Sequence, residues 1–89
     1  MNDDYTDAEM NAVFDFIRAR TQEDDPEAKF IKLDVFAGVC RGWARANGYR
    51  AKPNRVAVRA LVEQAGYRVA DTHTLGPVVT GLRFIPIGE

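Results

Sequence analysis

The chain has 89 residues, a hydrophobic fraction of 46%, a charged fraction of 28% and a net charge of -1, values typical of one small globular domain. No apolar run approaches the ~18 residues that a membrane span needs, and the acidic start does not resemble a secretory signal, so we expect a cytoplasmic protein without a membrane partner. One cysteine excludes an internal disulfide, and one cysteine with one histidine argues against a structural zinc site.

The small net charge hides an asymmetry along the chain. Residues 1–27 carry nine acidic and two basic residues, a net charge of -7, whereas residues 28–89 carry ten basic and four acidic residues, a net charge of +6. The basic excess is concentrated in residues 45–69, where six basic residues accompany one acidic residue. Such asymmetry is a recognised hint of a polyanion-binding surface, and it also arises on ordinary solvated faces.

The first element predicted is an amphipathic helix that ends near Arg20. Thr6 and Glu9 have the spacing of a capping box. Four apolar residues then follow at i, i+3, i+4 and i+7: Met10, Val13, Phe14 and Ile17. Phe16 lies off this stripe; we expect it in the core, with a partner or dimer contact as the alternative.

The next elements predicted are a loop, a strand and a second helix. TQEDDPE is acidic and aperiodic, which indicates a loop, and KFIKL at residues 29–33 favours a short strand. Asp34 is placed to cap a helix, and Gly48 to end it in the left-handed conformation. Its expected buried face is Phe36, Val39, Cys40 and Trp43. On that face, Trp43 is expected in the core rather than as a platform for a nucleic-acid base.

A third helix follows the short connection YRAKP. Asn54 is a natural N-cap, and Gly66 is placed to end the helix. Its apolar residues repeat the same spacing: Val58, Leu61, Val62 and Ala65. Two helices joined by a short connection form a helix-turn-helix candidate.

The last part of the chain predicts a β-hairpin. YRVAD alternates, THTLGP carries turn residues, and VVTGLRFIPI is β-branched and aromatic, so we expect two strands around a loop of roughly six residues. Gly76 precedes proline, which favours an extended backbone, and Gly81 indicates a bulge or close packing.

The complete order is helix, strand, helix, helix, strand, strand. This order predicts an α+β winged helix-turn-helix fold, in which the short strand completes a small three-stranded antiparallel sheet. We expect one domain over residues 1–89, with an acidic N-terminal helix and loop at 1–27 and a basic winged-helix lobe at 28–89.

Three segments also resemble a known family. DVFAGVCRGWARANGY, VRALVEQAGY and GPVVTGLRF resemble the C-terminal winged-helix region of phage and plasmid primase–helicases. The matching positions are Trp43, Asn47, Gly48, Val58, Val62, Gly66, Gly76, Gly81, Leu82, Arg83 and Phe84. The resemblance implies a stand-alone winged helix of phage or mobile-element type. It implies no helicase or primase activity, because no phosphate-cradling GxxxxGK[ST] motif occurs in the sequence.

The basic residues around the third helix form the candidate DNA site. If this helix enters a major groove, Arg55 and Arg59 are the expected base readers, because guanidinium binds guanine bidentately. Asn54 could reach a base edge or a phosphate. Arg50 and Lys52, in the connection, are expected on phosphates, which position the protein without specifying a sequence.

The hairpin supplies further candidates. His73 and Thr74 lie in its expected turn and Arg68 on its first strand, although the histidine is mostly neutral at pH 7. The alternative for both groups is ordinary solvated charge, with Arg59 and Glu63 as an i, i+4 pair.

Two functions fit these features. The first is a double-stranded DNA-binding protein, a regulator or a replication or recombination accessory of a phage or mobile element, with helix 54–65 in the major groove and a possible homodimer or protein partner. The alternative is a protein-interaction winged helix that binds a host or partner protein through its acidic N-terminal helix. We expect no enzymatic activity, small-molecule substrate, metal or cofactor, because no nucleophile–base arrangement has plausible support.

Overall fold

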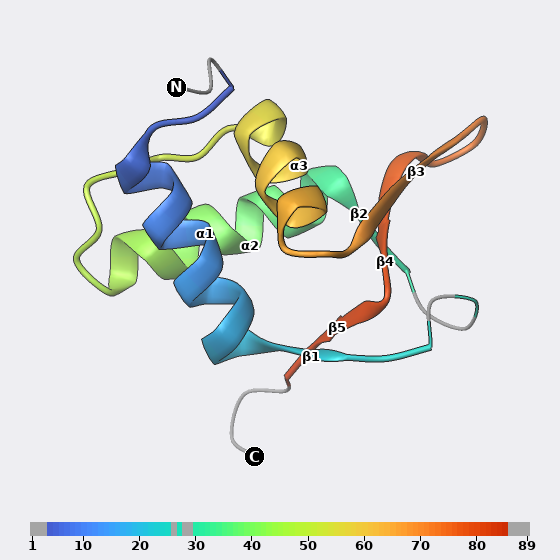
Figure 1. Ribbon diagram of the computed structural model, residues 1–89, viewed down its shortest axis with the longest axis horizontal. Helices are drawn as coiled ribbons and strands as arrows, with labels where there is room; N and C mark the ends of the chain where they lie inside the picture. The colour runs from blue at the N-terminus through green and yellow to red at the C-terminus, as the bar shows by residue number, and fades with distance from the viewer. Residues whose placement is uncertain (1–3, 26, 28–29, 86–89) are drawn as a thin grey trace.

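Three helices and two small antiparallel sheets make up the residues that the computed structural model describes, which are 4–25, 27 and 30–85 (Figure 1). The elements in chain order are α1 (Asp7–Arg20), β1 (Thr21–Glu23), β2 (Phe30–Lys32), α2 (Leu33–Ala46), α3 (Arg55–Gln64), β3 (Arg68–Thr72), β4 (Gly76–Thr80) and β5 (Leu82–Phe84). The α+β class predicted from the sequence is confirmed.

Helix α1 begins and ends where the sequence predicts. The Thr6 hydroxyl accepts a hydrogen bond from the backbone N–H of Glu9 at 3.2 Å, and the Glu9 carboxylate accepts one from the Thr6 N–H at 2.9 Å. This reciprocal pair satisfies two otherwise orphaned donors at the helix start. Phe16 is fully buried, so its predicted core position is confirmed.

The segment predicted as a loop after α1 contains a strand. β1 pairs antiparallel with β5, with Thr21 opposite Phe84. Thr21 is buried, and its hydroxyl donates to the carbonyl of Ile17 at 2.6 Å, which holds the chain as it leaves the helix. A three-residue strand with one buried residue is too short to show a period-two pattern, so the loop prediction is wrong for Thr21–Glu23.

Helix α2 differs from its prediction at its start and on one position of its face. Lys32 is the N-cap residue and makes no side-chain cap, so the predicted capping by Asp34 is wrong. The buried residues are Leu33, Phe36, Ala37, Cys40 and Ala44. This stripe leaves Trp43 half-buried against the core and Val39 44% exposed, so the predicted burial of Val39 is wrong.

Helix α3 is capped by Asn54, as predicted. The Asn54 side-chain oxygen accepts a hydrogen bond from the N–H of Ala57 at 2.9 Å. Val58, Leu61 and Val62 are fully buried. Ala65 is exposed at the C-cap, so its predicted place on the buried stripe is wrong, because the helix ends before that position turns toward the core.

The predicted three-stranded antiparallel sheet is present, in the order β2-β4-β3; its predicted first residue, Lys29, lies outside the described residues. The hairpin turn is tighter than expected, since Thr72 pairs with Gly76 and only 73–75 connect the strands. Gly76 has a φ of 71°, so its predicted extended backbone is wrong. A glycine adopts this left-handed conformation without the steric cost of a Cβ.

Gly81 divides the predicted last strand into two. Its φ of 85° turns the chain, so that β4 remains in the three-stranded sheet while β5 pairs with β1. A glycine adopts this conformation without the steric cost that a Cβ would add. The remainder of the predicted strand, from residue 86 onward, lies outside the described residues.

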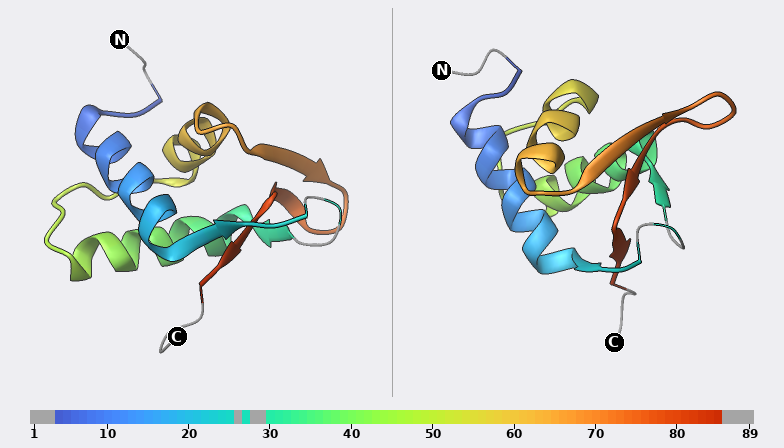
Figure 2. Two further views of the ribbon diagram at one scale, coloured as in Figure 1. Left: turned by 60° about the horizontal axis from the view of Figure 1, so that its bottom comes forward. Right: turned by 45° about the vertical axis from the view of Figure 1, so that its right-hand side comes forward.

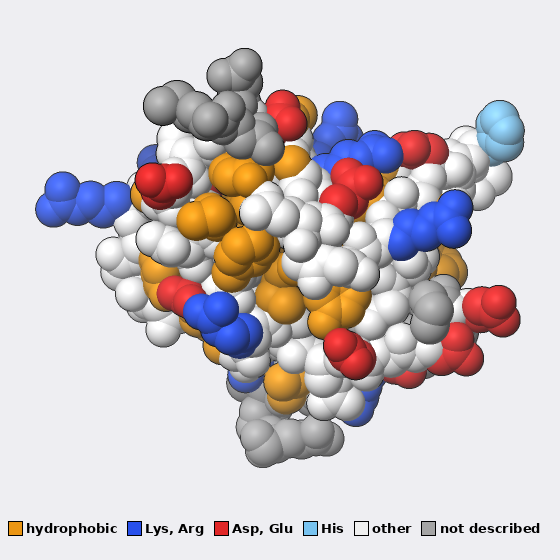
Figure 3. Space-filling model, in the orientation of Figure 1, with side chains coloured by type: hydrophobic (Ala, Val, Ile, Leu, Met, Phe, Trp, Pro, Cys, Tyr) orange, Lys and Arg blue, Asp and Glu red, His pale blue; other side chains and the backbone are white. Residues whose placement is uncertain are grey.

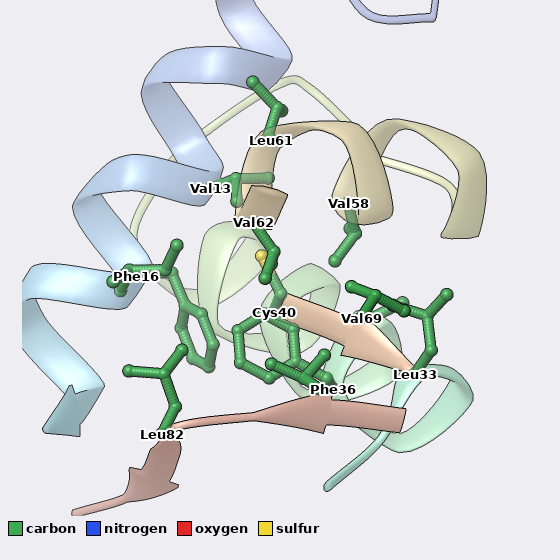
Figure 4. Packing of buried hydrophobic residues seen from close by; sticks show 13 residues of the cluster. Val13, Phe16, Leu33, Phe36, Cys40, Val58, Leu61, Val62, Val69 and Leu82 are labelled. Carbon is green, nitrogen blue, oxygen red and sulfur yellow. The ribbon is translucent and has the colours of Figure 1, made fainter. Parts of the chain in front are cut away.

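The core lies where the helices meet the sheets. Figure 4 shows Val13 and Phe16 of α1, Phe36 and Cys40 of α2 and the labelled side chains of α3 and the strands directed into one cluster. Burial raises the pKa of the Cys40 thiol to about 12, against a smaller opposing effect of Arg41, so Cys40 stays protonated at neutral pH. Among the helices in the described ranges, none combines the length and apolar composition that crossing a membrane requires.

Candidate nucleic-acid interface

The α2–α3 connector, residues 47–54, is positioned by the way α2 ends. Gly48 has a φ of 82°, confirming the predicted left-handed end. Its N–H donates to the carbonyl of Arg45 at 3.3 Å, and the N–H of Tyr49 donates to the carbonyl of Ala44 at 2.9 Å. These two bonds form a Schellman motif, in which an apolar contact to the last turn is common. Here the Tyr49 ring packs on Trp43, with 5.4 Å between the ring centroids.

A groove of about 530 Å³ lies between the C-terminal half of α2 and this connector. It is lined by Arg41, Gly42, Arg45, Tyr49, Ala51 and Lys52, and we call it the basic groove. Three of these residues are cationic and none is acidic. Arg41 donates a hydrogen bond to the carbonyl of Pro53 at 3.2 Å, which ties α2 to the residue just before the α3 cap.

The basic groove and the neighbouring Arg50 carry positive charge that is not neutralised by an ion pair. Within the part of the chain that the structure describes, no ion pair joins an acid to these four cations: Arg41, Arg45, Arg50 and Lys52. The sequence pattern singled out the two in the connector. The sequence-based prediction missed Arg41 and Arg45 on α2. Two arginines at i and i+4, outside the buried stripe of a helix, share one exposed face and could have been identified from the sequence.

The hydroxyl of Tyr49 is bonded to a carboxylate of α1. The Tyr49 hydroxyl donates a hydrogen bond to Asp15, which also forms an ion pair with Arg18. The hydrogen bond to Asp15 is the main cause of a raised Tyr49 pKa. The ring is therefore held by its backbone, by Trp43 and by its own hydroxyl.

The two predicted base readers on α3 both face carboxylates. Arg55 lies 2.9 Å from Asp34 of α2. Arg59 donates two hydrogen bonds to Asp71 of β3, at 3.0 and 2.8 Å, and its Nε lies 3.6 Å from Glu63. The alternative i, i+4 pair is thus confirmed. The hydrogen bonds from Arg59 are the main cause of a lowered Asp71 pKa.

The remaining predicted residues lie apart from the basic groove. Arg68 lines a different groove, whose walls include Glu23, Asp24 and Glu27. His73 and Thr74 are exposed in the hairpin turn, and the histidine is pale blue in Figure 3. Figures 1 and 2 place this turn and the connector at opposite ends of the molecule, with α3 between them.

Charged side chains of both signs are spread over the face that Figure 3 shows. In Figure 3 a basic side chain projects from the left-hand edge, where Figure 1 draws the connector. Acidic side chains gather at the lower right, near the segment that follows β1.

A second groove, of about 500 Å³, is mainly apolar. It is lined by Phe16, Val39, Gly42, Trp43, Phe84 and Ile85, with Arg20 beside them. Arg20 donates a hydrogen bond to the carbonyl of Ile85 at 2.9 Å. The sequence did not predict this apolar groove, because its walls come from α1, α2, β5 and Ile85, which are distant in the chain.

No protein-family model matches this chain, and no curated protein or solved structure is significantly similar to it. The resemblance to the winged-helix region of primase–helicases therefore remains a prediction.

Proposed function

We propose that the protein binds double-stranded DNA as a winged helix-turn-helix protein, a regulator or a replication or recombination accessory of a phage or mobile element. In this proposal α2 and α3 are the helix-turn-helix and the β3–β4 hairpin is the wing. The strand order β2-β4-β3 supports it, since the short strand before α2 joins the sheet formed by the hairpin. The hairpin also extends beyond the helices, as a wing would (Figure 2).

The observation that carries the proposal is the concentration of charge around the start of α3. The three cations of the basic groove, together with Arg50, come from α2 and the connector and form no ion pair within the described residues. The N-terminus of α3 adds the positive end of a helix dipole. Contacts of such cations with phosphates release counterions, which supplies most of the sequence-independent affinity for DNA.

The ion pairs on α3 are compatible with base reading by Arg55 and Arg59. Exposed pairs of this kind contribute little to stability, so their arginines can change partner at small cost. A bidentate arginine–guanine contact discriminates against a wrong base by about 1–3 kcal/mol. In the proposal, Arg50 and Lys52 position the protein on phosphates, while the two α3 arginines exchange carboxylates for bases.

The test is fluorescence anisotropy with a labelled mixed-sequence duplex over a range of salt. If four phosphates are contacted, the slope of log affinity against log salt is about -3.6, and affinity falls roughly 150-fold between ~50 and ~200 mM. Arg45→Gln/Arg50→Gln should make the slope shallower by about 1.8. Arg18→Gln, on α1, is a control outside the basic groove and should change the slope little. Absence of salt-sensitive binding at the lowest salt would overturn the proposal.

A second candidate function is binding of a partner protein, and the apolar groove favours it. In this version the contact surface is the groove at the C-terminal end of α1 rather than the acidic side chains of that helix. Exposed Val39 and exposed Arg45 lie on the same helix but line different grooves. A photo-crosslinking amino acid at position 39 should capture protein under this candidate, whereas one at position 45 should capture DNA under the first.

A further inference from the structure

The basic groove carries an aromatic wall in addition to its charge. Tyr49 lines it together with Arg41, Arg45 and Lys52. A cationic groove that also offers an aromatic ring is the arrangement by which proteins hold single-stranded nucleic acid, with phosphates on the cations and bases stacked on the ring. Duplex DNA cannot use the ring in this way, because its bases are already stacked on each other.

The Tyr49 ring is fixed before any ligand arrives. The Schellman motif sets its backbone, Trp43 packs against the ring, and its hydroxyl donates to Asp15. A side chain that is already immobilised loses little conformational entropy when a base stacks on it. The groove is therefore preorganised for a flat ligand.

The cations are placed to hold a phosphate beside that ring. Arg41 and Arg45 are one helical turn apart on α2, and Lys52 approaches from the connector. Arg41 uses one N–H on the carbonyl of Pro53, which leaves other guanidinium donors for a phosphate oxygen. The volume, about 530 Å³, lies in the range of sites that enclose small molecules.

From these observations we infer that the basic groove binds one unpaired nucleotide of a DNA strand, with its phosphate on Arg41, Arg45 and Lys52 and its base on Tyr49. The inference rests on the proposed DNA-binding function and adds a second feature of the DNA, an unpaired nucleotide. The preferred DNA is one in which a duplex adjoins a single strand, with the duplex on α3 and the unpaired nucleotide in the groove.

The test compares a labelled thymidine oligonucleotide with a mixed-sequence duplex of the same length, by anisotropy. Tyr49→Leu should weaken single-strand binding roughly 5- to 150-fold, the range for one lost aromatic–base stack, and leave duplex affinity unchanged. Tyr49→Phe is the matched control, since it keeps the ring and loses only the bond to Asp15, and should bind the oligonucleotide nearly as well as the original protein. Circular dichroism melts show whether each variant is folded.

A second measurement uses the unsubstituted protein, so that it does not depend on the folding of a variant. An oligonucleotide carrying 5-iododeoxyuridine is photo-crosslinked and the attachment site is mapped by mass spectrometry. Attachment at Tyr49 supports the inference, and attachment only outside the basic groove overturns it.

The outcomes separate this inference from the function on which it rests. A folded Tyr49→Leu variant with unchanged single-strand affinity and intact duplex binding overturns the groove assignment and leaves DNA binding standing. Absence of binding to both DNAs overturns the proposed function and the inference together. Thymidine monophosphate that competes as strongly as the oligonucleotide would identify the ligand as a free nucleotide and overturn the assignment to a strand.

Discussion

Arg59 shows at the scale of one residue how local and distant partners combine. Its i, i+4 neighbour Glu63 is readable from the sequence, but the closer partner is Asp71, which β3 brings alongside α3. Two parallel hydrogen bonds join the pair, and they lower the pKa of Asp71 and raise that of Arg59. At neutral pH this contact joins the hairpin to the helix as an ionised pair.

The Arg59–Asp71 pair predicts a specific pH dependence of stability. Because the Asp71 pKa is lower in the folded state, its stabilising contribution is present above the ordinary carboxyl value of ~3.9 and is lost as pH falls through the folded-state pKa. Asp71→Asn should therefore be less stable than the original protein at pH 7, with the difference shrinking in strong acid. Urea unfolding at pH 7 and at about pH 3 measures it; a difference that is independent of pH would contradict the assignment.

Helix α2 shows at the scale of an element how one segment serves both the core and a site. Its buried stripe holds Phe36 and Cys40, its other faces contribute Arg41 and Arg45 to the basic groove and Val39 to the apolar groove, and its Schellman end places Tyr49. These roles follow from the 3.6-residue period, which distributes neighbouring residues around the helix. A substitution at the C-terminal end of α2 is therefore expected to alter the basic groove.

Gly38, inside α2, and Gly48, just after it, are expected to respond in opposite directions to the same substitution. Gly48→Ala should destabilise the protein by about 1 kcal/mol, because alanine is strained at its positive φ of 82°. Gly38→Ala should stabilise it by ~0.5–1 kcal/mol, because a Cβ there meets nothing within 4 Å and alanine favours the helix interior. Thermal and urea unfolding of both variants provide the measurement; the same sign for both would contradict the conformational argument.

At the scale of the whole molecule, Phe16 joins the helices to the second sheet. Its ring centroid lies 5.5 Å from that of Phe36, 5.7 Å from that of Trp43 and 6.2 Å from that of Phe84. It therefore connects α1, α2 and β5 in one cluster.

The longest extent of the molecule is 35 Å, close to the ~34–36 Å of one duplex turn. In the proposed function, one chain would thus cover about one half-site, and a dimer or partner would supply a second.

Removal of the Phe16 ring should strongly destabilise the fold. Phe16→Ala is expected to cost about 3–5 kcal/mol through lost burial and a residual cavity, a large share of the ~5–15 kcal/mol that stabilises a typical domain. Phe30→Ala is the matched control, because Phe30 is 56% exposed, and should cost well under half as much. Urea unfolding compares them; equal losses would contradict the described core.

Features that depend on residues close together in the chain could be predicted from the sequence. Thr6 and Glu9 cap α1, Asn54 caps α3, and Gly48 ends α2, because each of these contacts forms within one turn of backbone. The apolar period also located the three helices, and the β-prone segments located most of the three-stranded sheet. The basic run at residues 45–69 includes Arg45, Arg50 and Lys52, but it also includes Arg55 and Arg59, which form ion pairs, and it leaves out Arg41.

Only the tertiary structure decided which distant residues meet. The β1–β5 pairing, the Arg59–Asp71 contact and the basic groove each join segments separated in the chain. Local propensity cannot specify such pairs, because their geometry depends on how the helices pack around Phe16. The same packing brings Arg55 and Arg59 of α3 onto carboxylates, whereas Arg41, Arg45 and the connector cations form no ion pair with the residues that the structure describes. What the sequence determined by itself was the three helices and the hairpin, because these depend on local periodicity and caps. What packing decided was the β1–β5 pairing and which arginines meet carboxylates, because these contacts join segments distant in the chain.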